Sequence, residues 1–442
     1  MRYAFYFRRW EGTFTKLAAV GAITWLAAMN AVAAPSLIPP RVEQVILDRI
    51  AAGQNPTIVI AIVDGDRNAV YAFGKLDSGA APTGSTVYEI GSITKTFTAT
   101  LLADSVAKGQ LRLDQPLSTL LQDFKIPSKD GKVITLANLA EQNSGLPRDP
   151  TNMVMTSLTD PFADYDRAKL QAFLATYTLP RLPGASYEYS NLAVGLLGYA
   201  LARHADTSYP SLLKATIFGP LGMKNTSVAV GEGDPSDMAT GHDSNGKEVP
   251  AWHFKALAAA GGIRSTGDDM LRYLKANMGM LSSPLQRAMQ LAQTPRASTT
   301  SPDTKIGLIW MTEHGVDSHD GPDVIWHGGE THGFQSFIGF TADHQRGVVV
   351  LTNANAGARD LGFATLLPYW PLASRRKQQR LPIDQGENMF SRKWPKNEAT
   401  DHSRAKSALG RKRTLAAQCW RAALHSLLLD RRQSRVDDLE KM

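Results

Sequence analysis

The sequence contains a single cysteine, Cys419, among its 442 residues. One cysteine excludes an intrachain disulfide framework, so the stability of the fold must come from packing and hydrogen bonds. Long apolar runs are also scarce: only residues 17–29 form one, and this run is short for a membrane span. These absences exclude a disulfide-rich mini-protein and a polytopic membrane protein.

Net positive charge is confined to one region of the chain. The chain has a formal net charge of +7 and an isoelectric point near 9.3. Residues 371–442 hold 17 Lys and Arg against 8 Asp and Glu, a net of +9, which leaves −2 for residues 1–370. A basic isoelectric point is typical of nucleic-acid binding, but here it describes only a C-terminal extension. We expect this extension to be partly helical or disordered, and we expect no nucleic-acid partner.

Residues 1–33 are predicted to be a secretory signal peptide. Basic residues up to Lys16 precede the apolar run 17–29, and small residues around Ala33 suit cleavage. We therefore expect a periplasmic or secreted protein with no transmembrane span after cleavage, and a monomer.

A single large domain is expected over residues 34–370. Strand-like runs lie at 56–77, 306–311 and 324–354, whereas residues 92–290 show mostly helical periodicity. Two separated groups of strands around a helical insertion predict an α+β fold, an α/β sandwich in which helices flank an antiparallel sheet of about five strands and adjoin a mostly helical lobe. A crevice between sheet and lobe is the expected place for a small-molecule site.

The pattern S-x-x-K occurs six times, and its context distinguishes one occurrence. Ser92 and Lys95 stand where a short apolar stretch gives way to a helical one that is expected to end at Gly109. A serine at the first turn of a helix lies among free backbone N–H groups, and a lysine one turn on can take its proton if burial lowers the lysine pKa. The other occurrences lie deep in a helix, in a polar loop or in the extension, at Ser105, Ser211, Ser244, Ser374 and Ser403.

Two further segments hold candidate site residues. Tyr189 and Asn191 follow a Pro-Gly turn just before an apolar helix, a pattern that alone indicates helix capping. The strand-like VIWHGG contains His327, and its glycines would let a ligand approach the strand backbone closely. Scattered His and Asp residues, such as those of HDSNG at 242–246, lack ligand spacing, so we expect no metal and no cofactor.

Together the three segments resemble the motifs of penicillin-recognising serine enzymes, in the same order along the chain. The likeness is greatest to class C β-lactamases and to their D-alanyl-D-alanine carboxypeptidase and esterase relatives. It covers residues 40–370 and includes the blocks AAGGIRSTGDDMLRYL and HGGETHGFQSFIGF. The C-terminal extension lies outside it.

The resemblance implies that Ser92 attacks the substrate carbonyl, while Lys95 and Tyr189 share the proton transfers, Tyr189 as an anion held by Lys95. It implies an oxyanion hole formed by the backbone N–H groups of Ser92 and Glu330. It implies substrate-binding roles for Asn191, His327, Gly329 and Glu330. The substrate would be a β-lactam. A D-alanyl peptide of peptidoglycan and a short-chain ester are alternatives, and so is a non-catalytic sensor or scaffold.

One motif departs from the family pattern. Class C β-lactamases usually carry Lys-Thr-Gly where this chain has His327, Gly328 and Gly329. A histidine with its ordinary pKa of about 6.5 would be mostly neutral at neutral pH, and a glycine lacks the hydroxyl that could bind a substrate carboxylate. The departure weakens the case for fast β-lactam hydrolysis without affecting acylation. Arg148 is a candidate for the missing positive charge.

Overall fold

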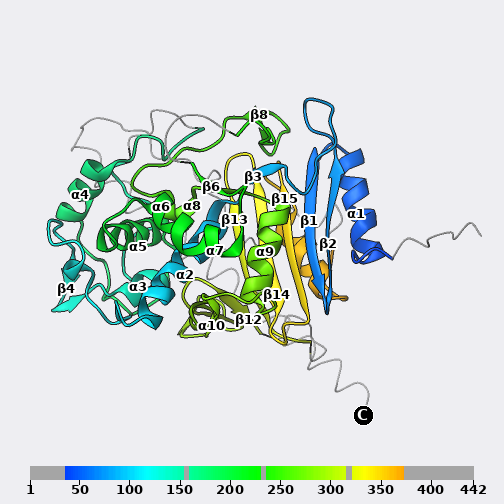
Figure 1. Ribbon diagram of the computed structural model, residues 1–442. Coiled ribbons are helices and arrows are strands. Elements are labelled where there is room, and N and C mark those ends of the chain that lie inside the picture. Colours follow the sequence, from blue (N-terminus) through cyan, green and yellow to red (C-terminus); the bar gives the residue numbers. More distant parts are fainter. Residues whose placement is uncertain (1–34, 154–158, 230–234, 315–320, 373–442) are drawn as a thin grey trace, which may run out of the picture. The chain divides into compact units, whose positions relative to one another are not determined.

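The computed structural model describes residues 35–153, 159–229, 235–314 and 321–372 (Figure 1). An antiparallel sheet has helices on both faces, and a mostly helical lobe adjoins it. The expected α+β fold is confirmed. The predicted signal peptide and the C-terminal extension lie outside the described residues, and their bounds remain predictions.

Eight strands form the main sheet, in the order β10–β11–β12–β13–β14–β15–β1–β2, and all neighbours are antiparallel. Their bounds are Thr57–Asp64 (β1), Arg67–Gly74 (β2), Ala297–Ser298 (β10), Thr304–Ile306 (β11), Met311–Glu313 (β12), Val324–Glu330 (β13), Gln335–Thr341 (β14) and Arg346–Thr352 (β15). Strand β1 pairs with β15, which places Ile60 opposite Val350. Segments far apart in the sequence therefore build one sheet, as predicted.

The sheet is wider than the five strands expected, because β10, β11 and β12 extend it beyond β13. The run 306–311, predicted to be a single strand, reverses the chain between β11 and β12 instead. The Gly307 N–H donates to the Trp310 carbonyl over 2.8 Å, and Ile309 has a left-handed φ of 70°. The sequence did not predict this turn because Ile309 and Trp310 are apolar and buried, as the residues of a buried strand would also be.

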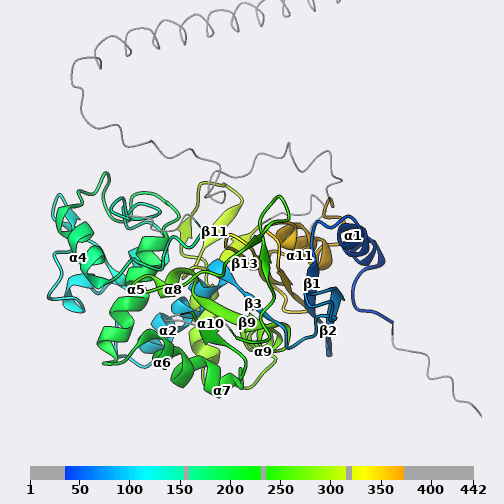
Figure 2. The ribbon, with the colours of Figure 1, turned by 90° about the horizontal axis from the view of Figure 1, so that it is seen from above.

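Helices cover both faces of the sheet, so β1 is buried along almost its whole length. Helices α1 (Pro40–Ala51) and α11 (Ala358–Leu366) lie on one face, and α9 (Gly267–Asn277) lies on the other (Figure 2). Alternate residues of β1, namely Ile58, Ile60 and Ile62, join the core under α1 and α11. A strand enclosed on both sides needs the continuous apolar sequence TIVIAIV.

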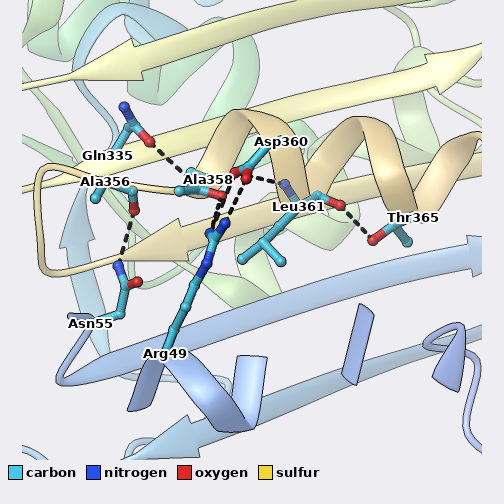
Figure 3. A network of polar contacts seen from close by, with 9 residues as sticks. Arg49, Asn55, Gln335, Ala356, Ala358, Asp360, Leu361 and Thr365 are labelled. Atoms are coloured by element: carbon cyan, nitrogen blue, oxygen red, sulfur yellow. Dashed lines mark hydrogen bonds and ion pairs between the residues drawn. The ribbon is translucent and has the colours of Figure 1, made fainter. Parts of the chain in front are cut away.

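A polar network joins α1 to α11 at the margin of this core (Figure 3). Arg49 Nη2 donates to Asp360 Oδ2 over 2.5 Å, and Nη1 donates to the Gly357 carbonyl over 3.0 Å. Asp360 lies in the first turn of α11, where the helix dipole favours negative charge. Because Arg49 is only 6% exposed, this pair is shielded from water and holds two sequence-distant helices together.

The helical lobe centres on α2 (Thr94–Ala107), which packs against α5 (Asn191–His204), α8 (Ala258–Gly261) and α10 (Gln286–Gln293). Buried threonine hydroxyls of α2 donate hydrogen bonds to backbone carbonyl oxygens. The Thr98 hydroxyl, for example, donates to the Ala259 carbonyl over 3.0 Å. The other helices are α3 (Leu136–Ala140), α4 (Arg167–Thr176), α6 (Tyr209–Leu213) and α7 (Gly219–Leu221). The shorter strands are β3 (Val87–Glu89), β4 (Ser128–Lys129), β5 (Lys132–Val133), β6 (Ser227–Val228), β7 (Gly241–His242), β8 (Glu248–Val249) and β9 (Ile263–Thr266). Within the described ranges, no helix has both the length and the apolar character needed to span a bilayer.

Candidate active site

Ser92 lies in a single 3₁₀ turn, Gly91–Ile93, that leads directly into α2. Lys95 follows in the first turn of α2, and its Nζ donates a 2.8 Å hydrogen bond to Ser92 Oγ. The helix ends before Gly109, whose φ of +71° suits a helix stop, as predicted. The serine and lysine of this pattern are therefore in direct contact.

The other S-x-x-K serines that the structure describes serve local structure. Ser105 Oγ donates to the Leu101 carbonyl within α2, and the Ser211 N–H donates to Ser208 Oγ at the start of α6. Ser244 lies in the turn between β7 and β8. Ser374 and Ser403 lie outside the described residues.

Lys95 is fully buried, with 0% exposure. Its Nζ also donates to the Ala260 carbonyl of α8 over 2.6 Å. Burial lowers the pKa of Lys95 well below its usual value, the positive charge of Arg148 lowers it further, and the carboxylate of Asp149 opposes both. The neutral amine, the form that can accept a proton, is thus favoured by the site.

Tyr189 is held beside this pair by the residue that follows it. Ser190 caps α5 by accepting the Ala193 N–H over 2.9 Å, and its own N–H donates to Gln142 Oε1 over 2.5 Å. With the chain so fixed, Lys95 Nζ lies 5.0 Å from the centroid of the Tyr189 ring. The capping role that the Y-S-N segment allowed belongs to Ser190, and Tyr189 is left facing the site.

Arg148 and Asp149 border the site on the side of α5. The Arg148 guanidinium carbon lies 5.0 Å from the Tyr189 ring centroid, on which it forms a cation–π contact. Asn191 Nδ2 donates to Asp149 Oδ1 over 3.0 Å, and burial raises the pKa of Asp149. Arg148 is a candidate from the sequence alone, whereas Asp149 and Ala260 are site residues that the sequence did not predict. The SGLPRD segment was the available signal for Asp149, whereas a backbone acceptor such as Ala260 leaves none.

His327 lies on β13 with its ring centroid 6.4 Å from that of Tyr189. Its Nδ1–H donates to the Gly328 carbonyl over 2.6 Å. Burial first, and then the charge of Lys95, lower the pKa of His327 to about 3. This histidine is therefore uncharged at neutral pH, more completely than its ordinary pKa implied.

Because Gly329 has no side chain, the backbone of another segment of the chain packs directly against it. A Cβ added at Gly329 would lie 2.0 Å from the Ile90 carbonyl oxygen and 2.3 Å from Ser336 Oγ. The space that a side chain at position 329 would need therefore holds Ile90, just before the Ser92 turn, and Ser336 Oγ donates to the Ile90 carbonyl over 2.8 Å. At Gly328 the nearest atom to an added Cβ is 3.7 Å away, so the predicted close approach of a ligand to the strand backbone stays a prediction.

The main chain of Glu330 lies next to the Gly91–Ile93 turn that holds Ser92. Gly91 has a φ of +48°, and a Cβ added there would lie 2.6 Å from the Glu330 nitrogen. The Glu330 side chain is engaged with Asn355, whose Nδ2 donates to Oε1 over 2.9 Å. The structure thus brings all seven predicted site residues to one region where α2, the start of α5 and the end of β13 meet.

Comparison with known proteins identifies the family. The sequence model described as Beta-lactamase matches residues 42–367. The chain belongs to the beta-lactamase family. Among its relatives are the β-lactamases of Pseudomonas fluorescens, 28% identical over 67% of this chain and 88% of the relative, and of Escherichia coli K12, 26% identical over 74% and 92%. The D-alanyl-D-alanine-carboxypeptidase/endopeptidase AmpH of E. coli K12 is 29% identical over 58% of this chain and 67% of AmpH.

Solved structures agree with this beta-lactamase fold. A class C β-lactamase superimposes with a TM-score of 0.64 at 22% identity, covering 75% of this chain and 96% of that one. The D-alanine carboxypeptidase AmpC of Burkholderia cenocepacia superimposes with a TM-score of 0.61 at 26% identity, covering 74% and 98%. The protein is a serine hydrolase of the beta-lactamase family with the fold of the class C enzymes, as the motifs predicted.

Proposed function

We propose that this protein opens β-lactam rings through an acyl-enzyme formed on Ser92. The observation that carries the proposal is the 2.8 Å contact between Ser92 Oγ and a Lys95 amine whose pKa burial lowers. With the amine neutral, the same contact can run in reverse, so that the Ser92 hydroxyl donates its proton to Nζ as Oγ attacks the lactam carbonyl carbon.

Breaking the lactam C–N bond requires a proton on the departing nitrogen. Tyr189 lies beside Lys95 and is the group proposed to relay the proton taken from Ser92 to that nitrogen. Water then attacks the carbonyl carbon of the acyl-enzyme ester, the C–O bond to Ser92 breaks, and a proton of that water passes to Ser92 Oγ as the opened product leaves. Arg148, whose guanidinium contacts the Tyr189 ring, is proposed to supply the positive charge that neutral His327 does not.

The tetrahedral intermediate needs donors for its oxyanion. The backbone N–H groups of Ser92 and Glu330 are proposed to fill this role, since Gly91 and Glu330 are in close contact. Loss of one such donor costs about 10²–10³ in rate in enzymes of this kind. Asn191, oriented by its hydrogen bond to Asp149, is proposed to bind an amide group of the substrate, with His327 and Gly329 forming the adjoining wall.

A D-alanyl peptide is the second candidate substrate. AmpH of E. coli and the Burkholderia protein are named as carboxypeptidases, and both are relatives of this chain. The uncharged His327 and the glycine at 328 each remove a group that could hold the carboxylate of a β-lactam or of a D-alanyl peptide, so these two residues do not decide between the substrates. Acylation of Ser92 is common to both substrates, and the two differ in the leaving group and in how fast water clears the acyl-enzyme.

Three substrates on one purified sample test the proposal: a chromogenic cephalosporin, a D-alanyl-D-alanine peptide and a short-chain ester. The Ser92→Ala variant should lose turnover by about 10⁴-fold or more and lose labelling by a fluorescent penicillin. Ser105→Ala is the matched control, since it alters the same helix and the same motif away from Lys95. Labelling that persists in Ser92→Ala would show that another residue is the nucleophile. Peptide turnover without cephalosporin turnover would select the second candidate.

Export stays part of this proposal and rests on residues 1–33 alone. Cell fractionation followed by N-terminal sequencing tests it: protein that stays in the cytoplasm would contradict export, and an intact residue 1 on the exported protein would contradict cleavage of the signal peptide.

A further inference from the structure

A second group of polar side chains lies outside the active site. Asp77, His242 and Glu248 each direct one ligand atom into a space where the three atoms lie within 4.8 Å of one another. Asp77 lies in the loop after β2, while His242 and Glu248 belong to the β7–β8 hairpin (labelled β8 in Figure 1). None of the three takes part in the proposed hydrolysis.

His242 is oriented as a metal-binding histidine would be. Its Nδ1 lies 3.2 Å from the Asn353 carbonyl oxygen. A carbonyl can only accept, so Nδ1 carries a proton and Nε2 is the ring nitrogen that remains for a metal ion. The side chain is 8% exposed, and Nε2 makes no hydrogen bond with any residue in the described ranges. This pairing of a ring N–H with a backbone carbonyl fixes the tautomer at many metal sites.

The two carboxylates approach Nε2 from different segments. Glu248 is the direct antiparallel partner of His242, so both side chains project from the same face of the hairpin. Asp77 occupies a turn closed by the Gly79 N–H donating to the Leu76 carbonyl over 2.8 Å. The Asp77 and Glu248 side chains are exposed and can adjust to an ion. Asp243, the next residue, accepts backbone N–H groups of the hairpin turn instead.

The spacing and chemistry suit a zinc-type ion. Bond lengths of about 2.0–2.2 Å in a tetrahedral site place neighbouring ligand atoms about 3.4 Å apart. His242 Nε2 and Asp77 Oδ1 are 3.5 Å apart already. One imidazole nitrogen with two carboxylates, and a remaining position for water, is a donor set that suits Zn²⁺ better than Mg²⁺ or Ca²⁺, which prefer oxygen ligands throughout.

We propose that Asp77, His242 and Glu248 bind a divalent transition-metal ion, with Zn²⁺ as the preferred occupant. The ion would connect the loop after β2 to the β7–β8 hairpin, which approach each other only in the folded chain. Since the unfolded chain cannot present these three ligands together, bound zinc should stabilise the fold. The proposal is independent of the hydrolytic function.

Isothermal titration of zinc chloride into the chelator-treated, untagged full-length protein tests the site. Asp77→Asn and Glu248→Gln keep side-chain size while weakening the ligand, and each should reduce zinc affinity about tenfold or more. Asp66→Asn, an exposed carboxylate in the β1–β2 turn, is the matched control and should leave affinity unchanged. Zinc should also raise the unfolding temperature of the wild type more than that of either ligand variant.

Co²⁺ spectroscopy gives an independent reading, because intense visible absorption reports four-coordinate binding and should vanish in His242→Gln. Zinc affinity that is equal in the wild type, Asp77→Asn and Glu248→Gln would place the ion elsewhere on the chain. An absence of zinc binding by the wild type would leave His242 and Asp77 as a simple ion pair. Either result overturns the proposal.

Discussion

Replacing Lys95 by methionine tests the central chemical step. Methionine has nearly the length of lysine and suits a fully buried position, but its thioether cannot act as a base at the Ser92 hydroxyl. Loss of a general base costs about 10²–10⁴ in rate, so acylation of Lys95→Met should slow by that factor.

The same substitution has a calculable structural cost. The Ala260 carbonyl, which accepts from Lys95 Nζ over 2.6 Å, would lose this partner. An unsatisfied buried acceptor costs about 1–3 kcal/mol, and the gain from no longer burying an amine offsets part of that. The variant should therefore fold, with a modestly altered free energy of unfolding.

Rapid-mixing acylation with a fluorescent penicillin, followed by intact-mass measurement, supplies the assay. Lys108→Met is the matched control, since Lys108 closes the neighbouring S-x-x-K pattern, is 57% exposed and pairs with Asp104 over 2.6 Å. It should acylate normally and lose no more than about 1 kcal/mol of stability. Because the pKa of Lys95 is lowered, wild-type acylation should decline as acid protonates the amine. Acylation of a folded Lys95→Met at the wild-type rate, with the same acid decline, would refute the assignment of Lys95 as the base.

Two further predictions concern β13. With its pKa lowered to about 3, His327 stays uncharged between about pH 5 and 8, so the His327→Gln variant should show the wild-type pH profile of acylation over that range. Between the pKa of His327 in the folded state and its pKa in the unfolded state, the folded state binds fewer protons at this histidine than the unfolded state does. The free energy of unfolding should therefore decrease as the pH is lowered from about 6.5 to 3, by at most about 1.4 kcal/mol per pH unit. Chemical denaturation at several pH values should show that the free energy of unfolding depends less steeply on pH in His327→Gln than in the wild type. Gly329→Ala should push β13 away from the turn that holds Ser92, because the new Cβ would lie 2.0 Å from the Ile90 carbonyl oxygen. Thermal unfolding should show that this variant loses about 1–3 kcal/mol of free energy of unfolding. Gly328→Ala should lose less, since the nearest atom there is 3.7 Å away.

Local chemistry explains which parts of the site were predictable. Ser92 and Lys95 lie one turn apart on one helix, so their contact follows from helix geometry and needs no tertiary information. Tyr189 was found only because its motif stands in a known order with the other two, since Y-S-N by itself indicates a helix cap. The residues that were missed act through long-range contacts: Ala260 through its carbonyl, and Asp149 through Asn191.

The strands that could be predicted are likewise those whose signal lies in neighbouring residues of the sequence. Strands β1, β2, β13, β14 and β15 have lengths and apolar patterns that indicate strands directly. The reversal at Gly307 does not, because a buried turn and a buried strand need the same apolar residues. The extra strands β10, β11 and β12 are two or three residues long, too short to show a periodicity.

By itself, the sequence determined the α+β class, the serine–lysine pair and the family, because each depends on periodicity or on a motif of neighbouring residues. Tertiary structure alone decided the charge state of the site. Enclosure by the folded chain lowers the pKa of Lys95 and of His327, whereas Arg148, brought beside Tyr189, keeps a positive charge there. Such effects arise from desolvation and from distances between residues far apart in the chain, and neither quantity exists before the chain has folded.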